Sequence, residues 1–376
     1  MSERIARFLA EQIPETPCLV VDLDLIVEAY EALRHNLPLA RIYYAVKANP
    51  ATEIIGMLNR EGASFDVASR GEIGLCLGNG VAPDRLSFGN TIKKERDIAY
   101  AYQAGVRLFA FDSTQELEKL ARATPGASVF CRILVDCDGA EWPLSRKFGC
   151  SPEMAVELLR QARSAGLDPY GISFHVGSQQ TNLGQWDGAV GTAARMFSAL
   201  AETDINLRMV NIGGGFPAHY SGEVPGVERY ARAVMAAITR HFGNDLPEII
   251  IEPGRSLVGD AGVIQSEVVL IAEKGGGDDR RWVYLDVGKF NGLAETMDES
   301  IKYRIATPGR GGSAGPVVLA GPTCDSADIL YEKTEYRLPL ALRAGDMVEI
   351  LSAGAYTASY ASVGFNGFEP IRTYCI

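Results

Sequence analysis

Blocks of apolar residues recur along the chain up to residue 261, and they are of two kinds. Short, almost continuous apolar runs, of which residues 42–46 are the clearest, are typical of strands covered on both faces. Longer segments between them have the pattern of helices. Strands are predicted at residues 42–46, 64–67, 86–88, 108–111, 129–135, 171–175, 209–212 and 248–251. Helices are predicted at residues 23–35, 53–59, 71–77, 93–104, 113–121, 152–165, 186–201 and 227–241.

Local signals support several of these helix starts. Ser113-Thr-Gln-Glu116 is a capping box, and Ser151 is an N-cap before a first-turn proline. Pro50 is likewise expected in the first turn of the helix after Lys47. Strands alternating with helices in this way favour a closed, parallel (β/α)8 barrel over an open doubly wound sheet.

After residue 261 the pattern changes to β-rich segments separated by turns. Strands are predicted at residues 263–271, 282–287, 317–320 and 347–351. These indicate a second, mainly antiparallel domain, which a short strand at residues 16–21 is expected to join. The predicted domains are therefore a barrel at residues 22–261 and a β-domain made of residues 1–21 and 262–376.

Composition narrows the classes of partner and location. The chain has 376 residues, 47% of them hydrophobic, and a net charge of -11 without a cluster of Lys or Arg, so neither nucleic acid nor a membrane surface is expected as a partner. No long apolar segment follows the N-terminal residues, which predicts a cytoplasmic protein. Seven cysteines without a Cys-x-x-Cys pair fit a reducing compartment, and four scattered histidines do not suggest a metal site.

A barrel of this type has its active site at the carboxyl ends of its strands. Loops are polar in any protein, so a scaffold alone would show polar residues there. One amine, several carboxylates, a histidine and a triple glycine on one rim nevertheless indicate chemistry. The residues at these ends are Lys47, Asp66, Asn90, Asp112, Arg132, His175 with Gly177 and Ser178, Gly213 to Gly215, and Glu252 to Arg255.

Each of these groups has a structural and a functional interpretation. Lys47 is either a solvated lysine at a strand end or a nucleophilic amine. Gly213 to Gly215 form either a simple turn or a cradle for a phosphate, to which Arg255 would add a bidentate cation. Glu252 could pair with Arg255, or could hold a protonated ring nitrogen. His175 could be a core histidine or could stack on a flat ring.

An amine, a phosphate cradle, a carboxylate and a stacking imidazole are the parts that a pyridoxal phosphate site needs. The motifs that contain them, in order over nearly the whole chain, resemble those of the basic amino acid decarboxylases with the alanine racemase fold (fold type III), in particular the bacterial ornithine decarboxylases. The motifs are Tyr44-Ala-Val-Lys-Ala-Asn49, Phe65-Asp66, His175-Val-Gly-Ser178, Gly213-Gly-Gly-Phe-Pro217, Glu252-Pro-Gly-Arg255, Gly321-Pro-Thr-Cys-Asp325, Gly354-Ala-Tyr356 and Phe365-Asn-Gly-Phe368.

The resemblance implies a role for each matching residue. Lys47 would carry the cofactor covalently, His175 would stack on its ring, and Glu252 would pair with its ring nitrogen. Asp66 would lie near Lys47, and Arg132 beneath the ring. The residues expected to hold the phosphate are Ser178, Gly213, Gly214, Gly215, Gly254, Arg255 and Tyr356. The resemblance also implies a head-to-tail homodimer in which Cys324 and Asp325 reach the partner subunit's site.

Further residues would act on the substrate. Cys324 would return a proton to the α-carbon, unless it is merely a packed thiol, and Phe365 would form an apolar wall beside the departing carboxylate. Asp325 is the main candidate to bind the distal amine and Asp298 the second, while Glu295 stays open. The segment 287–295 departs from the acidic loop of the eukaryotic enzymes, which leaves its contribution undecided.

The predicted reaction is the decarboxylation of L-ornithine to putrescine. A dual lysine/ornithine decarboxylase is the first alternative, because one methylene discriminates weakly. Diaminopimelate decarboxylase is the next, although that family usually has Cys-Glu-Ser where this chain has Cys324-Asp-Ser. Alanine racemase pairs its ring nitrogen with arginine rather than glutamate. A cofactor-free regulator of the antizyme-inhibitor type is the non-enzymatic alternative, and the intact Lys47, Arg255 and Cys324 count against it.

Overall fold

A computed structural model describes residues 1–142 and 147–376 of the chain. These residues form two compact units. The barrel unit consists of Val27–Pro217 and Val224–Gly254, and the β unit consists of Met1–Ile26, Ala218–Glu223 and Arg255–Ile376. The domain limits expected from the sequence stay a prediction.

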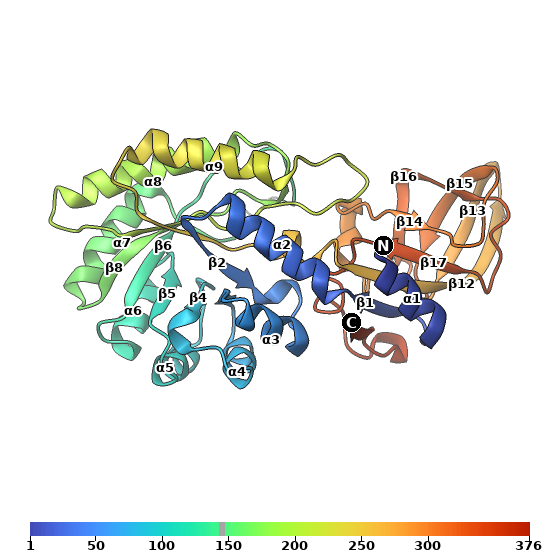
Figure 1. Cartoon of the computed structure of the whole chain (residues 1–376), viewed down its shortest axis with the longest axis horizontal. Coiled ribbons are helices and arrows are strands. Elements are labelled where there is room, and N and C mark those ends of the chain that lie inside the picture. The colour runs from blue at the N-terminus through green and yellow to red at the C-terminus, as the bar shows by residue number, and fades with distance from the viewer. Residues whose placement is uncertain (143–146) are drawn as a thin grey trace. The chain divides into compact units, whose positions relative to one another are not determined.

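The described part of the barrel unit contains eight parallel strands that close into a ring. Neighbouring strands pair in parallel throughout, and β11 pairs with β2 to close the barrel. Figure 1 labels β2, β4, β5, β6 and β8 among these strands. The predicted (β/α)8 barrel is therefore confirmed. Its strands are β2 (Ala40–Ala45), β3 (Ser64–Val67), β4 (Leu86–Phe88), β5 (Leu108–Phe111), β6 (Ser128–Arg132), β8 (Asp168–Ser173), β10 (Met209–Asn211) and β11 (Glu248–Ile251).

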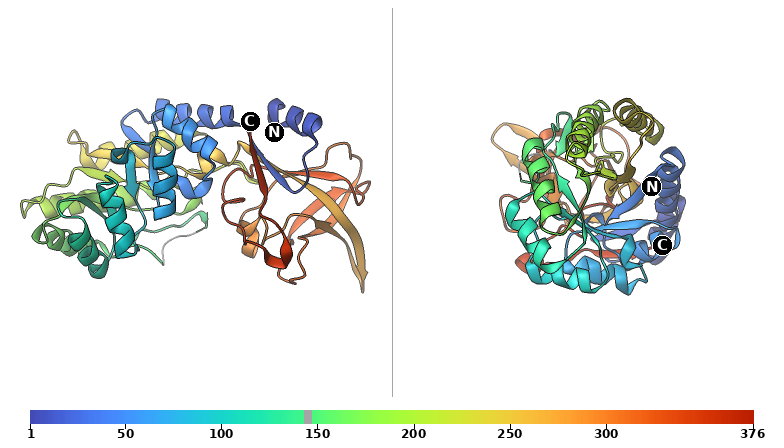
Figure 2. Two further views of the ribbon diagram at one scale, coloured as in Figure 1. Left: turned by 90° about the horizontal axis from the view of Figure 1, so that it is seen from below. Right: turned by 90° about the vertical axis from the view of Figure 1, so that its left-hand side faces the viewer.

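Helices surround these strands, as the end-on view in Figure 2 shows. They are α2 (Leu23–Asn36), α3 (Thr52–Arg60), α4 (Arg70–Gly78), α5 (Glu95–Gln103), α6 (Thr114–Ala123), α7 (Pro152–Ser164), α8 (Gln185–Ala201) and α9 (Val227–Phe242). Ser113 and Ser151 cap α6 and α7 as their sequences indicate. The expectation for Pro50 was wrong, because α3 begins at Thr52 with Ala51 at its N-cap.

Inside the barrel, one hydrophobic cluster is built from side chains of five strands. It consists of Tyr43, Ala110, Phe130, Met209 and Ile250, all buried. Large side chains from different strands fill the interior, so the barrel is a packed core whose chemistry is confined to its strand ends. None of the helices in the described residues has the length and the apolar character that crossing a membrane would require.

The β unit is built on a mostly antiparallel sheet, drawn in orange to red in Figure 1. Its strands, in spatial order, are β14 (Ile305–Ala306), β17 (Met347–Leu351), β12 (Gly262–Gly275), β13 (Asp278–Leu285), β15 (Ala314–Ala320) and β16 (Ile329–Pro339). As expected, the N-terminal strand β1 (Cys18–Val21) joins this sheet by pairing with β12. β1 also pairs in parallel with β18 (Arg372–Cys375).

Several elements of the β unit were not predicted from the sequence. They are the helix α1 (Glu3–Gln12) and the strands β14, β16 and β18. Ser2 accepts a hydrogen bond from the Ile5 amide and so caps α1, whose Ile5 and Leu9 pack with residues of β1 and β12. Short helical segments, α10 (Arg255–Val258), η3 (Ala294–Glu299) and η4 (Phe365–Gly367), carry residues discussed below.

Candidate active site

Lys47 and Asp66 lie side by side at the ends of neighbouring barrel strands. Lys47 is in a short helical turn, η1 (Val46–Ala48), directly after β2, and Asp66 is in β3 opposite Ala45. The Lys47 Nζ is 3.4 Å from Asp66 Oδ2, and half of the Lys47 side chain is exposed whereas Asp66 is buried. The strand register therefore holds a carboxylate beside an amine that a small molecule can reach.

Glu252 follows β11, and its carboxyl is connected by hydrogen bonds to the glycine-rich turn. Asn211 Nδ2 donates to Glu252 Oε1, and the Asn211 Oδ1 accepts from the Gly213 amide at 2.9 Å. Burial, with the nearby Asp66 carboxylate, raises the pKa of Glu252 to about 7, against the opposing effect of Lys47, Asn211 and Arg132. This carboxyl can therefore hold or release a proton near neutral pH.

His175 follows β8 and is held as a neutral imidazole. Its Nδ1 accepts a hydrogen bond from the Gly177 amide at 3.0 Å, which a protonated ring nitrogen could not do. Burial, followed by the positive charges of Arg132 and Lys47, lowers the pKa of His175 well below its usual value. A neutral, fixed imidazole is suited to stacking against a flat ring rather than to pairing with an anion.

Gly213 to Gly215 make a turn with no room for side chains after β10. A Cβ at Gly213 would lie 2.4 Å from the Phe174 oxygen, and the φ of Gly213 is 69°. A Cβ at Gly214 would lie 2.6 Å from the Glu252 oxygen and 3.4 Å from His175 Nε2. Only glycine therefore lets this backbone pass so close to the neighbouring strand ends.

Three further predicted residues lie at the same ends of the barrel strands. Arg132 is the last residue of β6, Ser178 is the first residue of the short strand β9 (Ser178–Gln180), and Gly254 lies just after β11. Burial lowers the pKa of Arg132, while the carboxylates of Glu252, Asp112 and Asp66 oppose this change. Arg132 is therefore a positive charge within electrostatic range of all three carboxylates.

Arg255 and Tyr356 belong to the β unit, where they are neighbours. The Arg255 guanidinium carbon is 4.8 Å from the centre of the Tyr356 ring, and Tyr356 has a φ of 55°. Arg255 forms an ion pair with Glu295, and Glu252 instead accepts from Asn211. The sequence-based alternative that paired Glu252 with Arg255 was therefore wrong.

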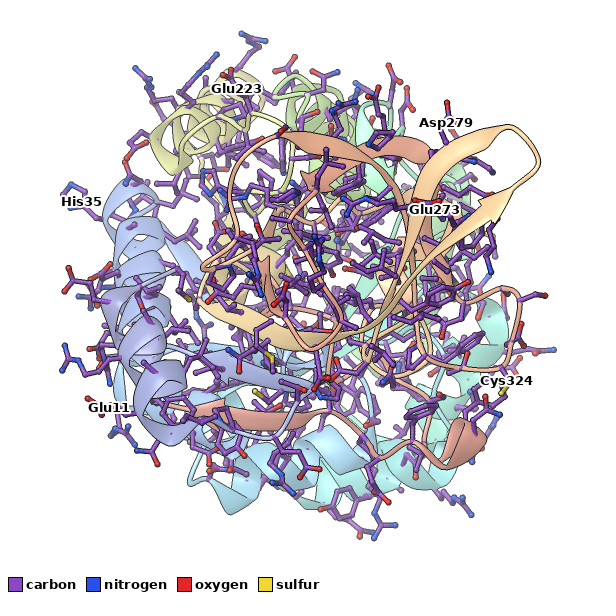
Figure 3. All side chains as sticks on the ribbon, turned by 90° about the vertical axis from the view of Figure 1, so that its right-hand side faces the viewer. Glu11, His35, Glu223, Glu273, Asp279 and Cys324 are labelled. Atoms are coloured by element: carbon purple, nitrogen blue, oxygen red, sulfur yellow. The ribbon has the colours of Figure 1, made fainter. Side chains whose placement is uncertain are left out.

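The loop that contains Cys324 and Asp325 is exposed, and a buried carboxylate accepts hydrogen bonds from the residue that precedes Cys324. Cys324 lies at the edge of the view in Figure 3, and its amide donates to Asn366 Oδ1 at 2.9 Å, so the loop is joined to η4. Asp325 Oδ1 accepts from the Ala327 amide at 2.8 Å. The buried Asp328 accepts from the amide and the hydroxyl of Thr323, at 3.1 and 2.7 Å.

Two more candidate substrate residues also lie in the β unit. Phe365, in η4, packs against Phe290 with ring centres 4.9 Å apart. Asp298, in η3, is exposed and has a left-handed φ of 52°. The structure thus brings Phe365 close to the Cys324 loop through Asn366, while Asp298 is placed on a separate segment.

Sequence reasoning missed two residues that orient others in this region. Asn211 is the last residue of β10, two positions before the triple glycine, so its place at a strand end could have indicated that it belongs to the site. Glu295 was considered only for the substrate amine, although it binds Arg255. No local pattern could have indicated that pair, because forty residues separate its members.

A family profile described as "Pyridoxal-dependent decarboxylase, pyridoxal binding domain" matches residues 23–259. The chain belongs to the pyridoxal-dependent decarboxylase family. The predicted family, decarboxylase class and cofactor, pyridoxal phosphate, are thereby confirmed.

Named relatives and solved structures agree with this family over the length of the chain. A lysine/ornithine decarboxylase of Selenomonas ruminantium is 36% identical over 370 residues, which are 98% of this chain and 91% of that protein. The structure of a Vibrio vulnificus lysine/ornithine decarboxylase complexed with cadaverine matches with a TM-score of 0.88 and 32% identity, covering 100% of this chain and 99% of that one. An arginine decarboxylase of the Paramecium bursaria Chlorella virus, bound to agmatine, matches with a TM-score of 0.90 and 26% identity over 100% of both chains.

The barrel unit of this decarboxylase fits its cofactor at three points. Lys47 offers a reachable amine, and beside it Asp66 Oδ1 is buried without a hydrogen-bond partner among the described residues. Glu252 offers a carboxyl with a pKa of about 7, so both its protonated and its ionised form are populated near neutral pH. The triple glycine offers backbone without side chains, as close approach of a phosphate requires.

Proposed function

We propose that this decarboxylase removes the α-carboxylate of a basic L-amino acid, and that its main reaction converts L-ornithine into putrescine and carbon dioxide. The observation that carries the proposal is the group formed by Lys47, Asp66, Glu252, Arg132 and His175 at one end of the barrel. The activities named for its relatives, lysine/ornithine and arginine decarboxylation, support the substrate class.

The residues of the barrel unit would divide the work on the cofactor. When bound, pyridoxal phosphate supplies an electron-accepting ring that takes up the electron pair left by the departing carbon dioxide. Lys47 would hold the cofactor's aldehyde carbon and release it to the substrate's amine. Glu252 would keep a proton at the ring nitrogen, which its pKa of about 7 permits. The neutral His175 would stack on the ring, and Arg132 would balance the carboxylates around it.

The phosphate would be held by backbone and by one cation. Amides of the glycine-rich turn and the hydroxyl of Ser178 would donate to its oxygens. Arg255 and Tyr356 would contribute from the β unit. The residues proposed for this role are Ser178, Gly213, Gly214, Gly215, Gly254, Arg255 and Tyr356.

The substrate's remaining groups would meet residues of the exposed loops. Cys324 would return a proton to the α-carbon after carbon dioxide has left, and Phe365 would keep water from the departing carboxylate. Asp325 is the main candidate to bind the distal ammonium, and Asp298, in η3, is the second, because both residues are exposed.

We propose that the loop carrying Cys324 and Asp325 acts in the site of a second subunit of a homodimer. This loop is exposed, and so are the apolar side chains of Val363 (85%) and Phe365 (37%), which supports a surface that a second subunit covers. The cytoplasm is the proposed location, supported by seven cysteines that are all free thiols.

L-Lysine is the second candidate substrate, favoured by the dual name of the Selenomonas relative. One methylene in a pocket changes discrimination by about 1–3 kcal/mol, so a dual preference is compatible with the same residues. Steady-state values of kcat/KM for L-ornithine, L-lysine, L-arginine and meso-diaminopimelate test this directly. We expect L-ornithine to have the highest value. A preference for meso-diaminopimelate would replace the proposed substrate.

Borohydride reduction of the freshly purified protein tests the cofactor site itself. We expect a pyridoxyl group on the peptide that contains Lys47, found by mass spectrometry after digestion. Lys94→Ala is a matched control, because Lys94 is exposed and caps no group with its side chain. A colourless protein without the pyridoxyl peptide would instead favour the cofactor-free regulator and would refute the proposed enzyme.

A further inference from the structure

Arg255 and Glu295 form a buried, bidentate ion pair within the β unit. Arg255 Nη2 is 2.6 Å from Glu295 Oε1, and Arg255 Nη1 is 2.7 Å from Glu295 Oε2. The side chains are only 3% and 7% exposed. Two parallel bonds of this kind fix the plane of the guanidinium as well as its position.

Two tyrosines complete the surroundings of this guanidinium. The Tyr220 hydroxyl accepts from Arg255 Nη1 at 2.6 Å, and the Tyr356 ring lies 4.8 Å from the guanidinium carbon. Burial alone would lower the pKa of Arg255, but Tyr220 and Glu295 more than offset it, so the pKa is above its usual range. Arg255 is therefore a permanent cation held in one orientation.

The same contacts exclude Glu295 from the role that its sequence position left open. Each of its carboxylate oxygens accepts a hydrogen bond from Arg255, and the side chain is buried. A substrate ammonium would have to enter this buried contact and compete with Arg255 for the carboxylate, which would weaken the pair that balances the arginine charge. Asp298, three residues further along η3, is exposed instead.

We propose that Glu295 is a positioning residue that orients Arg255 for the phosphate of the cofactor, and that it does not bind the substrate's distal amine. The inference deepens the proposed function and rests on it. An arginine oriented in advance loses little further conformational freedom when a dianion binds, so less of the binding free energy is lost in ordering it. Without Glu295, the same arginine would be a buried cation with a poorly defined orientation.

Comparing two ligands isolates this effect, because pyridoxal lacks the phosphate of pyridoxal 5′-phosphate. Cofactor-free protein is titrated with each aldehyde, and affinity is followed by the visible absorbance. In Glu295→Gln we expect affinity for pyridoxal 5′-phosphate to fall by roughly tenfold or more, the scale of one charged hydrogen bond. Affinity for pyridoxal should stay unchanged, and Glu295→Asp should restore part of the loss.

Asp298→Asn is the matched variant from the same short helix. We expect it to leave the preference for the phosphorylated ligand unchanged and to lower the kcat/KM ratio of L-ornithine to L-norvaline, which lacks the distal amine. Glu295→Gln should lower the preference for pyridoxal 5′-phosphate over pyridoxal and leave the ornithine-to-norvaline ratio unchanged. If Glu295→Gln lowered the ornithine-to-norvaline ratio by roughly tenfold or more, the scale of one charged hydrogen bond, Glu295 would be an amine ligand and the inference would be wrong.

An unchanged preference for pyridoxal 5′-phosphate over pyridoxal in Glu295→Gln would also overturn the inference. The pyridoxyl peptide at Lys47 would still be found in that case, so this failure differs from failure of the proposed function. Circular dichroism checks that each variant is folded. Should Glu295→Gln not fold, Glu295→Asp decides the question through the same ligand ratio.

Discussion

The surroundings of the Glu252 carboxyl disfavour its charged form, and the same surroundings suit it to exchange a proton. Desolvation of its charged form, followed by the Asp66 carboxylate, raises its pKa to about 7. Asn211 supplies a hydrogen bond that partly offsets the burial of the charged form. A carboxyl in this state is suited to share a proton with a ring nitrogen, whereas in the cofactor-free protein it is a partly desolvated charge above neutral pH.

This protonation predicts how Glu252 affects the stability of the cofactor-free protein. Between pH 4.5 and about 7 the folded protein holds a proton on Glu252 that the unfolded chain has released. The contribution of Glu252 to the free energy of unfolding should therefore fall as pH rises through this interval. Urea unfolding of the wild type and Glu252→Gln at several pH values measures it. A difference between the two proteins that is independent of pH would contradict the assignment.

Cys324 allows a prediction about the product rather than the rate. If its thiol returns the proton to the α-carbon, Cys324→Ala should allow the proton to reach the wrong carbon, and a carbonyl by-product should form. Product analysis by mass spectrometry checks this. Ser326→Ala, a neighbouring exposed position in the same loop, is the control. Clean diamine from Cys324→Ala would remove the thiol from the proposed reaction.

At this scale the sequence indicated many side chains but few of their partners. Lys47, Asp66, Arg132, His175 and Glu252 were predicted because each lies at or just beyond the carboxyl end of an apolar strand. The bonds between Asn211 and Glu252, and between Arg255 and Glu295, join positions 41 and 40 residues apart. Such pairs depend on how strands and segments are brought together, which a local pattern does not contain.

Among the elements, the ends of β4 and β5 are joined by a buried lysine. Lys93 Nζ donates to the Asn90 and Ala110 oxygens at 2.8 and 2.6 Å and lies 3.0 Å from Glu116 Oε1. Burial lowers the pKa of Lys93 to about 8, although Glu116 opposes the change. This network connects the exit of β4 to α6. The same exit passes Asp66 so closely that only Gly89 fits there, since a Cβ would lie 2.0 Å from Asp66 Oδ1.

Lys93→Met should therefore destabilise the protein, because Glu116 loses one buried partner and two carbonyl oxygens lose their donor. We expect a decrease of about 3 kcal/mol in the free energy of unfolding, measured by urea denaturation. Lys94→Ala, at the exposed neighbouring position, should change it by less than about 0.5 kcal/mol. Equal effects of the two substitutions would mean that the network contributes little.

The predictability of each element followed from how its residues are buried. Strands of the barrel were recognised because both of their faces are covered, which gives uninterrupted apolar runs. β16 was missed because exposed Glu332, Lys333 and Glu335 interrupt its apolar residues. β18 has no strong local signal, and among the strands of the described residues it pairs with β1 alone. In contrast, α1 carried a usable signal, since Ser2 caps it and Ile5 and Leu9 lie one turn apart.

For the molecule as a whole, shared active sites predict complementation between two defective variants. If Lys47 and Cys324 serve one site from different subunits, a mixed dimer of Lys47→Ala and Cys324→Ala contains one intact site. Random assembly of the co-expressed variants should then restore about a quarter of the wild-type rate of diamine formation. The rate is compared with that of each variant expressed alone. No gain over the separately expressed variants would argue that each subunit completes its own site.

The pairing of β1 with both β12 and β18 has a consequence for the order in which the protein is made. Residues 18–21, a fully buried Cys-Leu-Val-Val segment, emerge from the ribosome early, but one of their partners, residues 372–375, emerges only after the whole of the intervening chain. Until then this apolar strand has no paired strand on one of its edges. Protein synthesis that stalls late should accordingly leave a nascent chain prone to aggregation and dependent on chaperones.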